Sequence, residues 1–141
     1  MKAKKLYPDV VMRILNLTTA NLGYVKYEQI PEANRNIENT TSDYFSIRYV
    51  IKGDLCFIYI SVDMSETASE KYTDYIVASG CPLPLGGGSM RGLVMSNDGI
   101  NSACFVNGNG ELVISSYDRD ISNMHLHGVF IYMVDWEYPI L

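Results

Sequence analysis

The chain has 141 residues, of which 48% are hydrophobic and 19% charged, so it is long enough for one folded domain with a single core. Its formal net charge of −5 argues against a general nucleic-acid binder and against a membrane protein that relies on basic residues. No run of apolar residues approaches the roughly 20 of a membrane helix, and residues 1–15 lack the features of a secretory signal. We therefore expect neither membrane insertion nor a signal peptide.

The N-terminal third carries the weakest pattern. Residues 9–18 read DVVMRILNLT, and their β-branched side chains favour a strand over a helical turn. The polar run NRNIENTTSD, residues 34–43, is expected to be a loop. We expect one β-sandwich domain over residues 1–141, in which residues 1–40 supply a connecting segment and the first strands.

A β-hairpin over residues 44–62 is the clearest unit. Apolar side chains recur at every second position from Phe45 to Ile51, and again from Cys56 to Val62. This period of two predicts strands with one buried face, and Lys52-Gly53-Asp54 between them predicts the turn. The following residues, 64–71, predict a loop or a single helical turn, because no long apolar run follows their capping-box spacing.

A glycine-rich loop for phosphate or an oxyanion would most naturally lie in IVASGCPLPLGGGSMRG, residues 76–92. A P-loop would need glycine where Leu85 stands, and a dinucleotide fingerprint would need it where Arg91 stands. The chain also has no G-x-S-x-G elbow. We therefore expect a structural crossing between two sheets, in which a strand ends near Ala78, the prolines stop the pairing and the glycines turn the chain.

The second half of the chain repeats the pattern of short strands and turns. Turn signals stand at residues 97–99 (NDG) and 107–110 (NGNG), where Asn-Gly is a strong hairpin signal. Eight to ten short strands with little helix predict an all-β, antiparallel, jelly-roll-like β-sandwich. The strands predicted here are GLVMS (92–96), ACFV (103–106), ELVISSY (111–117) and GVFIYMVDWEY (128–138).

The last predicted strand is apolar on both faces, which is typical of a central strand or of one covered by a neighbouring subunit. One face carries Phe130, Tyr132, Val134, Trp136 and Tyr138, and the other carries Val129, Ile131 and Met133.

Few residues suggest chemistry, and we predict no catalytic residue and no cofactor. Cys56, Cys81 and Cys104 are odd in number and widely spaced, so neither a disulfide framework nor a zinc knuckle is expected, and Cys56 reads as a small buried hydrophobe. His125 and His127 would share one face of a strand. They are either surface histidines or two ligands of a metal whose third ligand would be one of Asp118, Asp120 and Asp135.

One cluster combines the side chains that commonly hold sugars. Tyr117, Asp118, Arg119 and Asp120 follow a predicted strand, and a ring face with a carboxylate and a guanidinium suits saccharide hydroxyls. The same four residues also fit an ordinary polar turn. We take them as the candidate ligand-binding residues with that alternative open.

Short segments of residues 44–134 resemble the C-terminal head domain of tail-fibre and baseplate proteins from phages and prophages of Gram-positive bacteria. The matching pieces are Ile76 to Pro84, Asn109 to Ile114 and Gly128 to Tyr132, with Cys81 where that pattern usually has leucine. The resemblance implies a homotrimeric jelly roll at the tail tip of the virion. It also implies assembly with other tail or baseplate proteins, synthesis in the host cytoplasm without a signal peptide, and binding to host cell-surface saccharide without catalysis. The alternatives are a purely structural virion protein of the same fold and a trimeric enzyme acting on polysaccharide.

Overall fold

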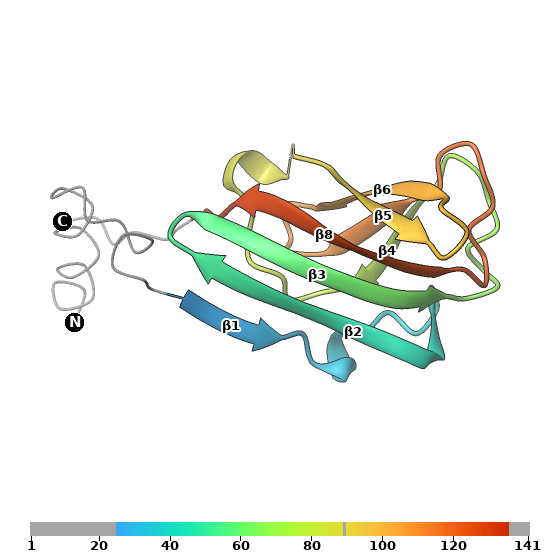
Figure 1. Cartoon of the computed structure of the whole chain (residues 1–141), viewed down its shortest axis with the longest axis horizontal. Helices are drawn as coiled ribbons and strands as arrows, with labels where there is room; N and C mark the ends of the chain where they lie inside the picture. Colours follow the sequence, from blue (N-terminus) through green and yellow to red (C-terminus); the bar gives the residue numbers. More distant parts are fainter. Residues whose placement is uncertain (1–24, 89, 136–141) are drawn as a thin grey trace, which may run out of the picture.

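The computed structural model describes residues 25–88 and 90–135, which fold into one curled antiparallel sheet with almost no helix (Figure 1). The strand order is β1-β2-β3-β8-β5-β6-β7-β4, so the last strand is inserted between β3 and β5. Two short 3-10 turns, η1 (Glu32–Asn34) and η2 (Leu85–Gly87), complete the structure. The strands are β1 (Val25–Gln29), β2 (Thr40–Lys52), β3 (Leu55–Met64), β4 (Asp74–Ala78), β5 (Gly92–Ser96), β6 (Asn101–Val106), β7 (Leu112–Ser115) and β8 (His125–Met133).

The predicted hairpin is confirmed as β2 and β3. Lys52 pairs with Leu55, so the turn consists of Gly53 and Asp54, and Gly53 has a φ of 63°. A residue with a side chain would be strained at that φ, which explains the glycine. The inward positions of both strands are buried as the alternation predicts: Ile47, Tyr49, Ile51, Cys56, Ile58, Ile60 and Val62.

Strands β5 and β8 are paired over a short stretch. Only two residue pairs join these strands, Met95 with His127 and Ser96 with Leu126. A Cβ at Gly128 would lie only 2.8 Å from the carbonyl oxygen of Leu93. The absence of a side chain at position 128 therefore allows β5 to pass close to β8.

The two halves of the curled sheet enclose one core. Ile47 and Val62 from the first half belong to the same buried cluster as Val77 and Ile114 from the second half. The curl therefore buries the inner face of the whole sheet and leaves its outer face toward solvent. An all-β fold is confirmed.

The segment between β1 and β2 covers the free edge of β4. Arg35 forms a β-bridge with Ala78, and the Asn36 amide donates to the carbonyl of Val77 at 3.0 Å. The Ser79 amide donates in turn to the carbonyl of Asn34 at 3.0 Å. Because unpaired edge strands invite aggregation, this contact protects the edge and brings the two ends of the sheet together.

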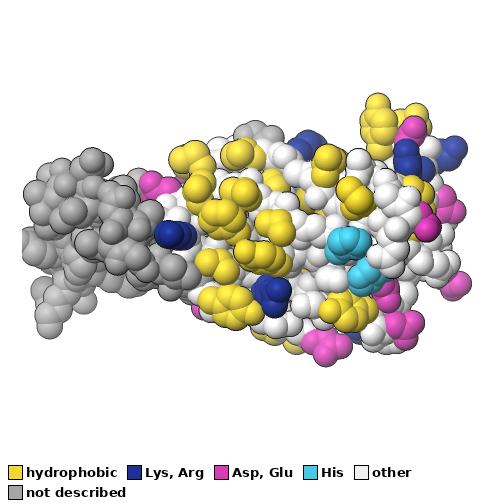
Figure 2. All heavy atoms as spheres, in the orientation of Figure 1, with side chains coloured by type: hydrophobic (Ala, Val, Ile, Leu, Met, Phe, Trp, Pro, Cys, Tyr) yellow, Lys and Arg dark blue, Asp and Glu magenta, His cyan; other side chains and the backbone are white. Residues whose placement is uncertain are grey.

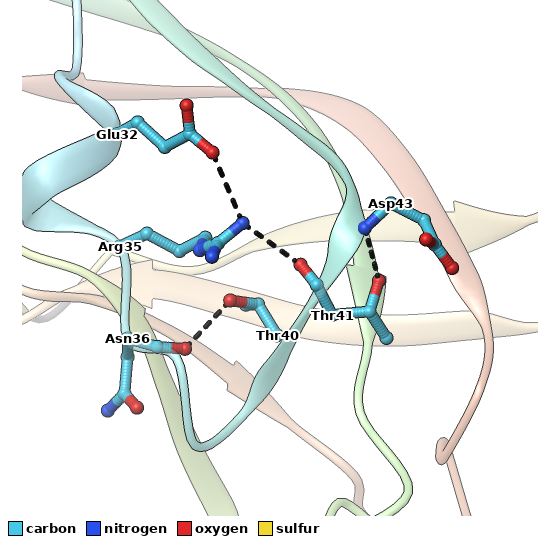
Figure 3. Close-up of polar contacts among 6 residues, drawn as sticks. All are labelled: Glu32, Arg35, Asn36, Thr40, Thr41 and Asp43. Carbon is cyan, nitrogen blue, oxygen red and sulfur yellow. Dashed lines mark hydrogen bonds and ion pairs between the residues drawn. The ribbon is translucent and has the colours of Figure 1, made fainter.

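The expectation of a loop over residues 34–43 was wrong for its last part, because β2 begins at Thr40. Arg35 Nη1 donates to the carbonyl of Thr41 at 3.2 Å and approaches Glu32 Oε1 at 3.4 Å (Figure 3). The Thr40 hydroxyl donates to the carbonyl of Asn36 at 2.7 Å. These contacts hold a polar sequence in an extended conformation, and propensity alone did not indicate them.

The glycine-rich stretch is structural. The Cys81 amide donates to the carbonyl of Gly110 at 2.9 Å, and the Tyr132 hydroxyl donates to the carbonyl of Pro82 at 2.7 Å. Gly88 has a φ of 93°, and a Cβ there would lie 2.3 Å from the carbonyl oxygen of Val106. The connection therefore needs glycine at position 88, where its backbone passes close to that of β6. It joins the edge strand β4 to β5 within a single curled sheet, whereas the sequence predicted a crossing between two sheets.

Residues 66–69, which follow β3, form turns and no helix, in agreement with the expected loop. Among residues 25–88 and 90–135, no helix is long and apolar enough to cross a membrane. Three predictions lie outside the described residues: the strand at 9–18, the role of residues 1–24, and the placement of Trp136 and Tyr138.

Candidate functional site

Two exposed tyrosines meet at the loops that flank β4 and β7. Tyr117 follows β7 and Tyr72 precedes β4, and their ring centroids lie 5.5 Å apart in an edge-to-face arrangement. The two residues are 67% and 74% exposed, so the pair offers ring surface to solvent. Sequence reasoning selected Tyr117 and missed Tyr72, although an aromatic residue in the polar run SEKYTD was a usable signal.

The backbone holds both tyrosines in an unusual conformation. Tyr72 and Tyr117 each have a φ of 53°, a region that costs a residue with a side chain about 1 kcal/mol or more. The Tyr72 amide donates to the carbonyl of Tyr117 and ties the two loops together. The buried Ser116 hydroxyl accepts from the Thr73 amide at 3.0 Å and donates to the carbonyl of Glu70 at 2.8 Å. These hydrogen bonds of Ser116 hold the loop before β4 against the loop after β7.

The rest of the predicted cluster surrounds Tyr117. Arg119 Nε lies 3.4 Å from Asp118 Oδ1, with both side chains about half exposed. Asp120 accepts a hydrogen bond from the Ser122 amide at 2.8 Å, and hydrogen bonds from the Ser122 side chain and backbone lower the pKa of the Asp120 carboxyl. Asp120 therefore serves the turn, while Tyr117, Asp118 and Arg119 are available to a ligand.

This arrangement, which we call the tip, is suited to holding a polar ligand and not to breaking bonds. The rings of Tyr72 and Tyr117 present apolar faces that can pack on the C–H groups of a sugar. The carboxylate of Asp118 accepts and the guanidinium of Arg119 donates hydrogen bonds, so together they match the two roles of a hydroxyl group.

A shallow hollow of about 330 Å³ lies on the outer face of β2, β3 and β8. The guanidinium of Arg48 stands 5.3 Å from the ring centroid of Tyr59 within it. Neither residue was predicted as a site residue, although the period of two in the hairpin places both on its outer face. The lining residues are Tyr44, Ser46, Arg48, Tyr59, Ile60, Ser61, His127, Gly128 and Val129.

The two histidines share one face of β8, as predicted, with ring centroids 5.9 Å apart. His125 is engaged at both ring nitrogens, because Nδ1 contacts Asp63 and Nε2 lies 3.1 Å from the Ser61 hydroxyl. The acid beside it is Asp63, which was not among the three proposed metal ligands. In the part of the chain that the structure describes, no group of three or more His, Cys, Asp or Glu residues is placed to hold a metal ion.

The three cysteines are buried and unpaired, and the prediction that Cys56 is a small core residue is confirmed. Burial raises the pKa of Cys56 to about 11 and the pKa values of Cys81 and Cys104 to about 12. Because the thiolate is the nucleophilic form, these thiols are inert at neutral pH.

Comparison with known proteins adds no family assignment. No protein-family model matches the chain, and a search of curated proteins finds no significant match. The resemblance to phage head domains therefore stands on the short segments that suggested it.

Proposed function

We propose that the chain is a non-enzymatic receptor-binding head of a phage or prophage tail, which binds cell-surface saccharide at the tip. The observation that carries the proposal is the pair Tyr72 and Tyr117, two exposed rings in contact on loops pinned by Ser116. The jelly-roll form, the homotrimer and the place in the virion belong to the same proposal and derive from the resemblance of residues 44–134.

The geometry of the tip favours a binding role over an ordinary turn. Glycine or asparagine fits a left-handed backbone at little cost, yet tyrosine stands at both positions. Two large rings also remain in water where burial would stabilise them. Backbone strain and exposed aromatic surface at one place are typical of a ligand site.

The experiment is direct binding by the intact chain. Purified protein is applied to an array of bacterial-surface saccharides and to washed cell walls of Gram-positive bacteria. The proposal expects retention on at least one saccharide and competition by that saccharide in free form. Protein that binds nothing on the array and none of the cell walls would contradict it, and would favour the purely structural virion protein.

Product release distinguishes the enzyme alternative from a binding head. After prolonged incubation with the same cell walls, a polysaccharide hydrolase releases new reducing ends, whereas a binding head releases none. Reducing ends that increase with time and with protein concentration would contradict the proposal.

A further inference from the structure

The outer face of β3, β8 and β5 is divided into a polar and an apolar half. The polar half carries Ser61, Asp63, His125 and His127. The apolar half, which we call the apolar face, is the patch of hydrophobic side chains beside the two histidines (Figure 2). It consists of Leu55, Phe57 and Tyr59 on β3, Val129, Ile131 and Met133 on β8, and Leu93 and Met95 on β5.

The apolar face is large for a surface exposed to water. Apart from Phe57, its side chains are between 37% and 59% exposed. With about 100 Å² for each fully exposed aliphatic side chain and about 200 Å² for an aromatic one, they leave roughly 350 Å² of apolar surface, within the range of the largest patch on a typical monomer. A standard interface buries about 800 Å² on each partner. The apolar face can therefore form the apolar centre of such an interface, and the polar residues around it would supply the rest of the area.

The charges around the apolar face permit contact with an identical face. The chain has a formal net charge of −5, which would oppose association of copies through an acidic surface. However, the outward positions of the three strands in this half carry no carboxylate among the described residues. The flanking charges are of both signs. On β2 they are Arg48, which packs on Tyr59, and Lys52, which pairs with Leu55. The carboxylates are Asp54, directly before Leu55, and Asp135, two residues after Met133.

We infer that the apolar face is where copies of this chain associate, with a second copy of the same face as its occupant. A contact between two copies of the same face is two-fold and makes a dimer, so the inference stands apart from the proposed homotrimer, which would need a different contact. Two sheet faces pack about 10 Å apart with their side chains interdigitated, and the β-branched and methionine side chains of β8 suit such packing. An identical copy matches the uncharged character and the size of the face. The hollow then lies at the rim of the contact, since Tyr59 and Val129 belong to both.

The test is the molar mass of the intact chain in solution, measured by light scattering from about 1 to 100 µM. Wild-type protein is expected to be a dimer, and Ile131→Asp is expected to be a monomer with an unchanged circular dichroism spectrum. Ile37→Asp is the matched control, because Ile37 is 77% exposed in the turn before β2, away from the apolar face. The Ile37→Asp variant should remain a dimer.

A second variant covers the case in which Ile131→Asp does not fold. Ile131→Thr keeps a β-branched side chain and removes apolar surface, so it should raise the dissociation constant about tenfold. A monomeric wild type, or an oligomer that neither change weakens, would overturn the inference. An oligomer that Ile131→Asp dissociates but that binds no saccharide would support the inference and contradict the proposed function instead.

Discussion

The rings of Tyr72 and Tyr117 meet edge to face, 5.5 Å between centroids, because β4 and β7 are neighbours in the sheet. Asp74 pairs with Ser115, so the residues just before β4 lie beside those just after β7. Their contact depends on the sheet register and on the hydrogen bonds of Ser116 beneath the loops.

Removing the Ser116 hydroxyl should loosen the tip. Ser116→Ala leaves the Thr73 amide without its partner, while the Glu70 carbonyl keeps its hydrogen bond from the Tyr75 hydroxyl. We therefore expect a loss of about 1–3 kcal/mol in unfolding free energy. Hydrogen exchange at the Thr73 amide should also accelerate. Urea unfolding and amide exchange measure the two effects.

Ser102 provides the matched control for Ser116. It is also buried, at 2% exposure, but its hydroxyl has no hydrogen-bond partner within the described part of the chain. Ser102→Ala should therefore be neutral or slightly stabilising. Equal losses in the two variants would show that Ser116 does not pin the loops.

A side chain at Gly128 should open the joint between β5 and β8. In Gly128→Ala the new Cβ meets the carbonyl oxygen of Leu93, and relieving that clash should cost about 1–3 kcal/mol of unfolding free energy. At Gly108 the nearest atom to a new Cβ is 3.7 Å away, so Gly108→Ala should change stability little. Denaturant midpoints that fall equally would contradict the tight approach of β5 to β8.

The buried thiols should make stability fall at alkaline pH. The ordinary thiol pKa is 9.0, and Cys56, Cys81 and Cys104 titrate at about 11 or 12 in the fold. Below pH 9 the thiols are protonated in both the folded and the unfolded chain, and their contribution to the unfolding free energy does not change with pH. Between pH 9 and 10 the unfolded chain loses thiol protons that the folded chain keeps. Unfolding free energy therefore falls, for each thiol by up to about 1.4 kcal/mol per pH unit.

Urea midpoints at pH 8, 9 and 10 check this prediction. Cys104→Ala should lower the unfolding free energy at every pH because it leaves a cavity. The fall in unfolding free energy between pH 9 and 10 should be smaller than in the wild type, because one of the three thiols is gone. A midpoint that stays constant from pH 8 to 10 would contradict the burial of the three thiols.

Local pattern predicted the hairpin β2–β3 and the turns at Gly99 and Gly110, because alternation and turn residues act between near neighbours. The insertion of β8 between β3 and β5 was not predictable, because strand partners far apart in the chain leave no local signal. Tyr72 was not predicted as the partner of Tyr117 for the same reason. The contact of residues 34–36 with β4 was not predicted. It is made by backbone hydrogen bonds, which leave no side-chain signal, and the polar side chains of this segment are typical of a loop.

The saccharide affinity of Tyr117→Gly shows whether the tip is the binding site. Glycine accepts the φ of 53° without strain, so this variant should fold at least as well as the wild type while losing one ring of the tip. Asn123→Gly is the control, since Asn123 has a φ of 57° and no ring. The account predicts at least a tenfold loss of binding to cell walls for Tyr117→Gly and unchanged binding for Asn123→Gly. Wild-type binding by a well-folded Tyr117→Gly variant would contradict it.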